Sequence, residues 1–434
     1  MKATLKKIIT HILKIESRLV LRKYKPKIIA ITGSVGKTST KDAVYAVLSQ
    51  ISYVRKSEKS FNSEIGLPLT ILGVPNGWSN PAVWAENVLR GLWLILWPHK
   101  YPKWLVLEVG VGKPSDMEAT ASWLKTDAVI ITAIGETPVH IEFFESRKQI
   151  IEEKSELIKT LKKDGVLILN ADDEAVLEMK SKSKNVTVTY GFSEGADVFG
   201  SGDSISYDEY GEPEGVIFRA DNDGKSLPVV IEGVFGRSHV YASLATLALS
   251  AGLKFNMIRA VESLKNYDVP PGRMRLLKGV KETLIIDDTY NSSPIACESA
   301  LKTLGEIKYQ KEGQGRKIAI LGDMLELGKH THDAHRNIGK ITEENADFLI
   351  IVGPRAKAIK EGAIEAGMRT EIPEFLNSYE AADFIKSFIE KGDIILVKGS
   401  QGMRMERIAE ALLLDRKNKS KLLVRQDIEW LNKA

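Results

Sequence analysis

Residues 28–39 read IIAITGSVGKTS, and this stretch decides the fold class. An apolar strand runs into a glycine loop that ends in Gly36-Lys37-Thr38 and opens a helix. In such a loop the backbone N–H groups and the helix N-terminus converge on phosphate oxygens. The full P-loop pattern has a glycine five positions before its second glycine, and Ile31 stands there instead. The sequence therefore predicts nucleotide binding through a shortened P-loop.

Each residue type in this loop has a use in phosphate chemistry. The Lys37 ammonium would neutralise charge on the β- and γ-phosphates, and the Thr38 hydroxyl would hold Mg²⁺. The predicted ATP-binding residues of the loop are Gly33, Ser34, Val35, Gly36, Lys37, Thr38 and Ser39.

Strand-like apolar runs alternate with helical stretches around the loop. The predicted strands are 27–32, 104–110, 127–135 and 165–170, and the predicted helices are 37–50, 115–124, 147–163 and 172–180. This alternation indicates right-handed βαβ units on a largely parallel sheet. Residues 185–232 hold short β-like pieces with many Gly and Asp, which predict a small antiparallel excursion before a helix at 239–252.

The alternation restarts after Pro270-Pro271-Gly272, with predicted strands at 283–288, 317–323, 347–353 and 393–399. A Pro-Pro-Gly between two alternating blocks is typical of a hinge, so we place a boundary near 268–274. The predicted fold class is α/β, a P-loop ATPase domain with a parallel sheet followed by a Rossmann-like domain. The predicted units are a basic amphipathic helix (1–26), the central domain (27–269), the C-terminal domain (270–414) and a basic tail (415–434).

The composition excludes several classes of protein. The 434 residues, 43% hydrophobic and 27% charged, indicate two or three domains. A net charge of +4 argues against a bulk nucleic-acid binder and against an acidic disordered protein. Cys297 is the single cysteine, which excludes an internal disulfide and any multi-cysteine metal site. The sequence has neither a membrane-spanning apolar run nor a signal peptide, so we expect a cytoplasmic protein.

The basic character of the chain belongs to its first 27 residues, which hold nine Lys and Arg against one acid. Their net charge is +8, so the rest of the chain carries −4. Helical spacing relates the apolar residues of this segment, which are Leu5, Ile8, Ile9, Ile12, Ile15 and Leu19. Such a helix fits docking to an anionic membrane surface, and it equally fits a helix packed on the domain that follows.

Five of the seven tryptophans, Trp78, Trp84, Trp93, Trp97 and Trp104, lie within 78–104. Indole rings favour the lipid headgroup boundary, so this segment fits an interfacial membrane contact. A helix that covers the sheet, or a wall that faces the substrate, explains the same pattern.

Three polar residues stand at or beyond strand ends. Glu108 ends a predicted strand, where an acid faces the ligand crevice and can carry a metal, although a solvated strand end would look the same. His140 follows the loop after the next strand, and Lys154 lies in an acidic helix. The simpler explanations are that His140 is a loop histidine and Lys154 a surface lysine. Their spacing alone does not indicate a functional role.

Polar clusters also follow the strands of the second block, at 287–294 (DDTYNSSP), 322–326 (GDMLE) and 398–400 (KGS). The carboxyl ends of successive parallel strands are where such sheets bind ligands. Helix N-caps would alternatively explain Asp288 and Ser400.

Together these residues resemble the Mur ligase family, and within it the MurF type. The matching segments are GSVGKTST (33–40), NSEIGLPLT (62–70), EKSE (153–156), Gly272-Arg273, DDTYNSSP (287–294), ILGDMLELG (320–328) with His335, and VKGSQGMRME (397–406), together with Glu108 and His140. The resemblance runs from about residue 27 to 412.

The resemblance implies an ATP-dependent amide ligase of cell-wall precursor synthesis. ATP would convert a peptide carboxylate to an acyl phosphate, and an amine would attack it to give a tetrahedral intermediate. The implied substrates are a muramoyl-peptide-type acceptor and D-Ala-D-Ala or a similar amine. The implied cofactors are ATP and two Mg²⁺ ions.

The resemblance also implies residue roles. Thr38 and Glu108 would hold one metal ion and His140 the other. Lys154 would be carbamylated by CO₂, which turns a cation into a metal-ligating carboxylate. The implied catalytic residues are Lys37, His140, Lys154 and Arg273, and the implied metal ligands are Thr38, Glu108, His140 and Lys154.

Further implied roles concern the nucleotide and the amine. Arg273 would meet the γ-phosphate when the C-terminal domain closes, and Asp288 the ribose hydroxyls. His239 would contact adenine, at a position usually held by Asn. The implied substrate contacts are Asn62, Asn291, Asp323, Glu326 and Lys398.

The sequence departs from the family pattern at several places. Ala133 and Ala242 stand where Asn is usual, Gln401 stands where Arg is common, and the loop before His140 is longer. A full MurF-type ligase has a UDP-sugar-binding domain before its P-loop, whereas 32 residues precede Gly33. We therefore expect a lipid-linked or nucleotide-free acceptor at the membrane, contacted by residues 1–23 and 78–104.

Two other functions stay open at this stage. One is a related ligase with another acceptor, of the folylpolyglutamate type or for an amino-acid polymer, against which DDTYNSSP and LGDMLELG weigh. The other is a nucleotide-binding scaffold without catalysis, against which the complete set of Lys37, Glu108, His140 and Lys154 weighs.

Overall fold

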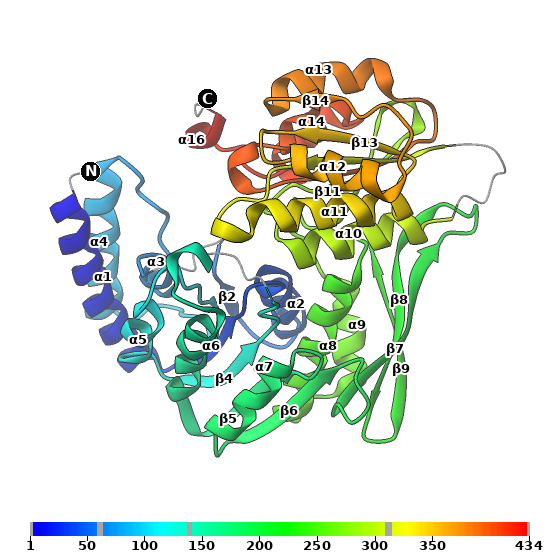
Figure 1. Cartoon of the computed structure of the whole chain (residues 1–434). Coiled ribbons are helices and arrows are strands. Elements are labelled where there is room, and N and C mark those ends of the chain that lie inside the picture. The colour runs from blue at the N-terminus through cyan, green and yellow to red at the C-terminus, as the bar shows by residue number, and fades with distance from the viewer. Residues whose placement is uncertain (1–2, 59–63, 137–140, 309–314, 432–434) are drawn as a thin grey trace.

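Two β-sheets, one of nine strands and one of six, organise the residues that the structure describes. The computed structural model describes residues 3–58, 64–136, 141–308 and 315–431. In Figure 1 the nine-stranded sheet and its helices form the lower part of the molecule, and the six-stranded sheet lies above them.

The larger sheet is built around the strand that leads into the P-loop. Its order is β2-β3-β1-β4-β5-β6-β7-β8-β9. The first six strands pair in parallel. They are β1 (Lys27–Thr32), β2 (Val54–Lys56), β3 (Trp104–Glu108), β4 (Thr126–Ile131), β5 (Leu161–Asn170) and β6 (Val186–Gly191). Because β1 lies between β3 and β4, the carboxyl ends of all three meet at the P-loop, and the predicted parallel sheet is confirmed.

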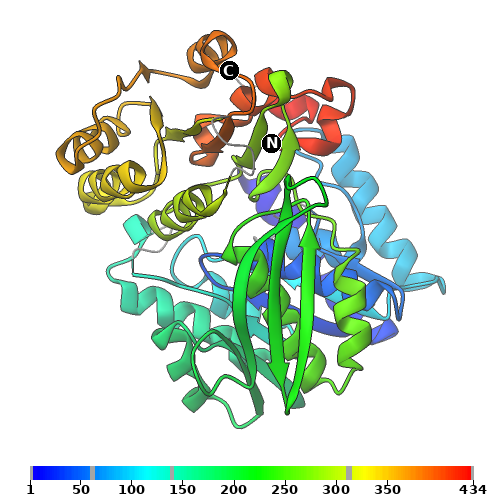
Figure 2. The ribbon, with the colours of Figure 1, turned by 90° about the vertical axis from the view of Figure 1, so that its right-hand side faces the viewer.

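Three long strands continue this sheet: β7 (Val198–Tyr207), β8 (Pro213–Asn222) and β9 (Lys225–Glu232). β7 is parallel to β6, and β8 and β9 follow in antiparallel order. Figure 2 shows them running down the front of the molecule. The predicted excursion is thus an extension of the main sheet. The sequence did not predict β7 as a long strand because it contains several Gly, Ser and Asp residues.

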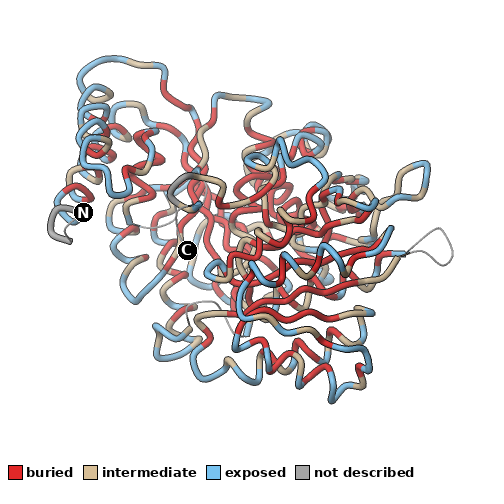
Figure 3. Tube along the Cα trace, turned by 90° about the horizontal axis from the view of Figure 1, so that it is seen from above, coloured by how far each residue is buried: buried red, intermediate tan, exposed pale blue. Residues whose placement is uncertain are grey.

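Helices cover both faces of the larger sheet. Ile29 and Ile31 of β1 pack with α2 (Lys37–Ser49) and α8 (Arg237–Gly252), beside which lies α9 (Met257–Leu264). Ile28 and Ala30 point to the opposite face, as alternation along a strand requires. The helices of that face are α1 (Ala3–Tyr24), α3 (Gly66–Leu72), α4 (Pro81–Leu96), α5 (Asp116–Ala121), α6 (Arg147–Ser155) and α7 (Glu174–Leu177). Figure 3 shows the burial that results along the strands.

α1 and α4 lie side by side at the outer edge of the molecule (Figure 1). The predicted apolar stripe of α1 is split, because Ile9 is buried while Ile8, Ile15 and Leu19 are exposed. Leu13 and Val20, outside that stripe, make the core contacts. In the described chain no helix combines the length and the apolar character that crossing a membrane demands.

The smaller sheet has the order β10-β11-β15-β12-β13-β14. Its strands are β10 (Arg275–Lys278), β11 (Leu284–Asp288), β12 (Lys317–Gly322), β13 (Phe348–Val352), β14 (Glu374–Phe375) and β15 (Ile394–Lys398). All pairs are parallel except β10 with β11. Its helices are α10 (Pro294–Glu306), α11 (Thr331–Asn345), α12 (Lys357–Ala366), α13 (Ser378–Phe388) and α14 (Glu406–Leu412). The sequence predicted these strands except the short β10 and β14.

The two sheets are joined where β9 leads toward β10. Val234 forms a bridge with Arg275. The Phe235 N–H donates to the Met274 carbonyl at 3.0 Å, and the Leu276 N–H donates to the Gly233 carbonyl at 2.9 Å. These contacts lie next to the Pro270–Gly272 segment that we predicted as a hinge.

The segment predicted as a basic tail folds back onto the C-terminal domain. It contains the short helices α15 (Lys419–Leu422) and α16 (Ile428–Leu431). Between them Leu423 is buried, and Arg425 is 8% exposed. Residues 415–431 are therefore part of the folded domain, because buried contacts hold them.

Candidate active site

The P-loop needs glycine at its first position. Gly33 has φ +143°, and a Cβ there would lie 2.0 Å from the Thr132 hydroxyl. That hydroxyl donates to the carbonyls of Thr32 and Val35, and the Ser34 and Val35 N–H groups donate to the Ala133 carbonyl. The end of β4 thus clamps the loop, and α2 begins directly after Gly36, whose φ is +87°.

Two lysines share one carbonyl oxygen of the loop. Lys37 Nζ donates to Gly33 O at 2.8 Å, and Lys154 Nζ donates to the same oxygen at 3.0 Å. Burial lowers the pKa of Lys37, Glu108 opposes this and Arg273 adds to it. Burial, and then Lys37, hold the pKa of Lys154 well below its usual range, and this side chain is only 4% exposed. Lys154 is therefore an interior group, against the simple expectation for a lysine in an acidic helix.

Glu108 lies beneath the start of α2. It is 2% exposed, and its Oε2 accepts from the Thr38 hydroxyl at 3.0 Å and lies 3.6 Å from Lys41 Nζ. Carboxylate and hydroxyl oxygens are ligands that Mg²⁺ takes together with phosphates and waters. This donor pair therefore fits a magnesium ion at the P-loop. A group of three or more acidic, His or Cys side chains with metal-binding spacing is absent from the described residues.

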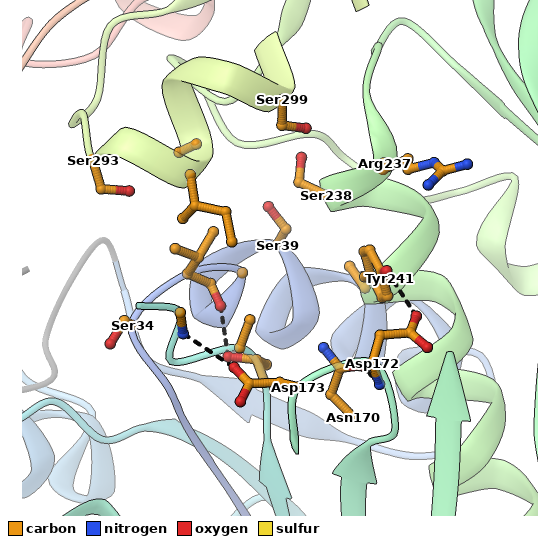
Figure 4. Close-up of a pocket in the computed structure, with 18 of the residues that line it drawn as sticks. Ser34, Ser39, Asn170, Asp172, Asp173, Arg237, Ser238, Tyr241, Ser293 and Ser299 are labelled. Atoms are coloured by element: carbon orange, nitrogen blue, oxygen red, sulfur yellow. Dashed lines mark hydrogen bonds between the residues drawn. The ribbon is translucent and has the colours of Figure 1, made fainter. Parts of the chain in front are cut away.

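A cavity of about 680 Å³ adjoins the loop and reaches the C-terminal domain. Figure 4 shows its walls, with Ser34 and Ser39 from the P-loop region, Asn170 and Asp173 from the end of β5, and Ser293 beside α10. A volume of this size and polar groups on every wall suit a nucleotide.

Arg273 links the two domains at this cavity. Its Nη2 donates to the Thr38 hydroxyl at 3.3 Å, and its guanidinium lies 4.0 Å from the centre of the Tyr290 ring. A cation held here by the hinge is placed to meet a phosphate bound at the P-loop.

Asp288 and Lys398 form a buried ion pair at 2.6 Å on the wall contributed by the C-terminal domain. Lys398 Nζ also donates to the Asn291 carbonyl at 3.0 Å, and the Met274 N–H donates to Asp288 at 3.3 Å. These side chains from β11, the loop after it and β15 line the same cavity as the P-loop. The structure thus brings the clusters at 287–294 and 398–400 together.

Several predicted site residues lie away from the cavity. His239 is fully buried and bonds the Tyr267 hydroxyl at 3.0 Å and the Arg273 carbonyl at 2.7 Å, so it supports the hinge instead of facing adenine. Asp323 is buried and accepts from the Ala356 N–H at 2.8 Å, and Glu326, which has φ +64°, follows in the same loop. Neither acid lines the cavity. Asn62 and His140 lie outside the described residues.

His335, part of the motif around 320–328, acts on that loop from within. Its Nε2 accepts from the Met324 N–H at 2.9 Å, and Nδ1 lies 2.6 Å from the Thr331 carbonyl. Burial lowers the pKa of this imidazole. The histidine is therefore a neutral support of the loop.

Other cavity residues were missed from the sequence. Asp173 accepts from the Ile134 and Gly135 N–H groups at 2.7 and 3.0 Å. Asp172 accepts from the Tyr241 hydroxyl at 2.7 Å (Figure 4). Burial alone would raise the pKa of Asp172, but hydrogen bonds from Phe192, Ser193 and Tyr241 outweigh it and lower this pKa. The signal was available, since Asn170, Asp172 and Asp173 follow a predicted strand as Glu108 does.

The sequence matches known protein families and individual enzymes along most of its length. Residues 31–250 match the model of the Mur ligase middle domain, and residues 272–401 match that of the Mur ligase, glutamate ligase domain. A UDP-N-acetylmuramoyl-tripeptide--D-alanyl-D-alanine ligase of Bacillus subtilis is 30% identical over 398 residues, covering 92% of this chain and 78% of that protein. The enzyme of that name from Synechocystis is also 30% identical, over 89% of this chain and 75% of its own length.

Solved structures are similar along most of the chain. MurF ligase from Thermotoga maritima in complex with ADP has a TM-score of 0.75 and 25% identity, and the match covers 93% of this chain and 83% of that one. Folylpolyglutamate synthase from the same organism shares the fold alone, with a TM-score of 0.59 and 17% identity over 95% of each chain.

A P-loop domain and a second α/β domain meet at a nucleotide-sized cavity, and with the similarity to curated ligases this places the chain among the ATP-dependent ligases. The chain belongs to the Mur ligase family, and within it to the MurF type. The resemblance drawn from the motifs is confirmed, as is the expected α/β fold.

Proposed function

We propose that this enzyme joins the peptide carboxylate of a muramoyl tripeptide to the amine of D-alanyl-D-alanine, as the name of its relatives states for the UDP-linked tripeptide. The expected lipid-linked or nucleotide-free form of the acceptor stays a prediction. The observation that carries this proposal is a single cavity lined by Ser34, Gly36 and Ser39 of the P-loop region, by Arg273, and by Asp288 and Lys398 of the second domain. Arg273 also donates to the Thr38 hydroxyl beside that cavity.

The reaction has two steps, phosphoryl transfer and attack by the amine. A carboxylate oxygen of the peptide attacks the γ-phosphorus of ATP, the bond to the β-phosphate oxygen breaks, and ADP leaves. The amine nitrogen then attacks the acyl carbon, inorganic phosphate leaves with its oxygen, and the nitrogen loses a proton. Lys37 and Arg273 place positive charge beside the transferred group, where charge spreads over three oxygens in the transition state.

The binding roles follow the walls of the cavity. Backbone N–H groups of the loop at 33–39 and the α2 N-terminus hold the phosphates. We assign Asp288 to the ribose hydroxyls and Asn291 and Lys398 to the amine, and their place on the cavity wall of the C-terminal domain supports this. Thr38 and Glu108 would hold a magnesium ion, which supplies charge neutralisation between the phosphates when bound.

We also propose that Lys154 is carbamylated. Its amine would add to CO₂ with loss of a proton, and the resulting carboxylate would be a metal ligand with His140. Support comes from its burial and from its place against Gly33 beside Lys37, because a neutral amine in the interior is the reactive form. The expected result is that Lys154→Ala loses ligase activity and that formate or acetate partly restores it, measured as phosphate release.

Retained activity in Lys154→Ala, without any effect of formate, would contradict the carbamate. Lys159→Ala is the matched control, because Lys159 is an exposed residue of the following 3-10 helix that pairs with Glu156 at 2.7 Å. We expect Lys159→Ala to keep wild-type activity with and without formate.

For location, we propose a cytoplasmic enzyme that contacts the inner face of the membrane. The single-cysteine composition supports a reducing compartment, and the net +8 charge of residues 1–27 supports contact with anionic lipid.

The test of the ligase proposal is phosphate release with ATP and Mg²⁺. The acceptors are UDP-N-acetylmuramoyl-tripeptide, its lipid-linked form and folate, each with and without D-Ala-D-Ala. We expect release that requires both the muramoyl tripeptide and D-Ala-D-Ala. Release that ignores every acceptor, or that responds only to folate, would overturn the proposal. Lys37→Ala is the negative control, since it removes the phosphate-binding cation.

A further inference from the structure

α4 presents an apolar face to solvent. Its buried residues are Trp84, Asn87 and Gly91. The exposed apolar residues on its other side are Leu89, Leu92, Trp93, Leu96 and Trp97, with Leu96 66% exposed. Trp93 and Trp97 stack on each other with ring centres 4.3 Å apart. Soluble proteins rarely leave so many large apolar side chains together unless a partner covers them.

α1 extends this face across its seam with α4. Glu16 of α1 packs directly against Gly91, where a Cβ would lie 2.2 Å from its carboxylate. The exposed Ile15 precedes Glu16, and the exposed Leu19 stands one turn after it. Leu19, three residues after Glu16, lies on the same side of α1 as Glu16, and Ile15, four residues before Leu19, is its neighbour on the helix surface. We call the set Ile8, Ile15, Leu19, Leu89, Leu92, Trp93, Leu96 and Trp97 the α1–α4 face.

The two helices are fixed to each other at their carboxyl ends. Lys23 Nζ donates to the carbonyls of Leu94, Ile95 and Trp97 at 2.9, 2.9 and 2.6 Å. The Tyr24 hydroxyl donates to the Leu94 carbonyl at 3.0 Å. A cation at the end of α4 also suits the helix dipole. The α1–α4 face is therefore a rigid surface.

Positive charge borders this face. Lys7, Arg18 and Arg22 are exposed along α1, and among the described residues they form no ion pair. The exposed acid of α4, Glu86, is paired with Arg90 at 2.6 Å. The border thus carries an excess of uncompensated cations.

We propose that the α1–α4 face docks on an anionic lipid bilayer, with both helices lying in the headgroup region. Indole rings favour that depth, and Lys and Arg beside an apolar helix face favour anionic headgroups. A second copy of the chain would bring its own Lys7, Arg18 and Arg22 against the same cations of the first copy. A peptide would need a groove, whereas this face lies on the outer side of two helices. This docking surface rests on the proposed location of the enzyme at the inner face of the membrane, and it names the residues that make the contact.

The test is co-sedimentation of the full chain with vesicles, without nucleotide or substrate. The vesicles contain phosphatidylcholine alone or with about one third phosphatidylglycerol. We expect binding to the anionic vesicles, a blue shift of tryptophan fluorescence, and weaker binding as salt rises from about 0.1 to about 0.5 M. Trp93→Ser with Leu96→Ser should lower the partition coefficient at least about tenfold. Arg18→Gln with Arg22→Gln should lower it about tenfold on anionic vesicles.

The matched control is Leu376→Ser with Tyr379→Ser, two exposed apolar residues of the C-terminal domain, which should bind like the wild type. Absence of binding to anionic vesicles, or equal binding by Trp93→Ser with Leu96→Ser, would overturn the proposal. So would sedimentation velocity showing a dimer that the same variant dissociates, because a second copy would then cover the face.

Failure of the ligase proposal gives a different result. Turnover of the soluble muramoyl tripeptide by the wild type is measured without vesicles, so it tests the ligase proposal alone. If the wild type binds vesicles but does not turn over the tripeptide, the proposed ligase substrates are wrong and the proposed docking surface stands. If it turns over the tripeptide but does not bind vesicles, the docking surface is wrong and the ligase proposal stands.

Discussion

At the scale of single residues, Gly33 is the point on which the site depends. Its carbonyl oxygen accepts from both Lys37 and Lys154, and its Cα stands against Thr132. Two lysine amines are thus gathered on one backbone dipole. A phosphate would compete with that dipole for Lys37, and the preformed geometry lowers the cost of ordering the lysine.

Gly33→Ala is predicted to weaken ATP binding about 100-fold, equivalent to about 2.7 kcal/mol. The added Cβ would lie 2.0 Å from the Thr132 hydroxyl, and φ +143° is unfavourable for alanine. The loop would therefore shift and its N–H groups would lose their common focus. Isothermal titration with ATP measures the effect. Gly112→Ala is the control, because a Cβ there has only Asp116 within 4 Å, at 3.5 Å. Wild-type affinity in Gly33→Ala would contradict the argument.

At the scale of elements, the seam between α1 and α4 contains a buried acid. Glu16 is 3% exposed, and among the described residues neither carboxylate oxygen has a hydrogen-bond partner. Burial raises the pKa of Glu16 to about 7. An ionised carboxylate there is costly, so the charge on Glu16 opposes the packing of the two helices.

We expect the stability of this seam to fall as pH rises. The folded chain binds the Glu16 proton more tightly than the unfolded chain, whose value is 4.5, so the free energy of unfolding decreases between about pH 4.5 and about 7. Glu16→Gln should remove that slope and be more stable than the wild type at pH 8 by about 1 kcal/mol or more. Thermal unfolding from pH 5 to 8 measures it. Exposed Glu118→Gln should keep the wild-type slope, and equal slopes in all three proteins would refute the assignment.

The C-terminal segment braces the loop that carries Tyr290. Arg425 donates to the carbonyls of Thr289, at 3.1 Å, and of Tyr290, and it pairs with Glu406 at 2.7 Å. Tyr290 in turn stacks under Arg273. Arg425 therefore positions Tyr290 and, through it, Arg273, the residue that we propose to meet the phosphates, without lining the cavity itself.

Arg425→Gln is predicted to lower kcat about tenfold while ATP affinity stays within about twofold, since the P-loop is untouched. Amide hydrogen exchange of residues 287–292 should rise in the same variant. Arg416→Gln, in the same segment but bonded only to the Ala411 carbonyl at 2.8 Å among the described residues, is the control. Tyr290→Leu tests the stack without unpairing a buried charge. Unchanged kcat and unchanged exchange in a folded Arg425→Gln would disprove the bracing role.

At the scale of the whole molecule, the sequence predicts the parallel strands and the phosphate loop well, because both depend on local pattern. It misjudges what depends on distant partners. His239 occupies a family position, yet its ring turns to Tyr267 and the Arg273 carbonyl. Lys154 looks like a surface residue until α6 packs on the P-loop. The exposed part of α1 depends on where α4 lies, which spacing within α1 does not contain.

The joint between the sheets at Gly233–Phe235 and Met274–Leu276 also determines which contacts survive when the domains separate. Arg273 stands next to this joint, and so does Asp288, whose carboxylate accepts from the Met274 N–H, while Lys398 lies one strand farther, on β15. Atoms near an axis of rotation travel little and atoms far from it travel most. A rotation about the joint would therefore keep both the Arg273 guanidinium and Asp288 close to the P-loop, and it would carry β13 and β14, at the other edge of the sheet, the farthest. Opening would then separate the loops after β12 and β13 from the central domain before it separates the side of the cavity that holds Asp288, which gives product departure a direction.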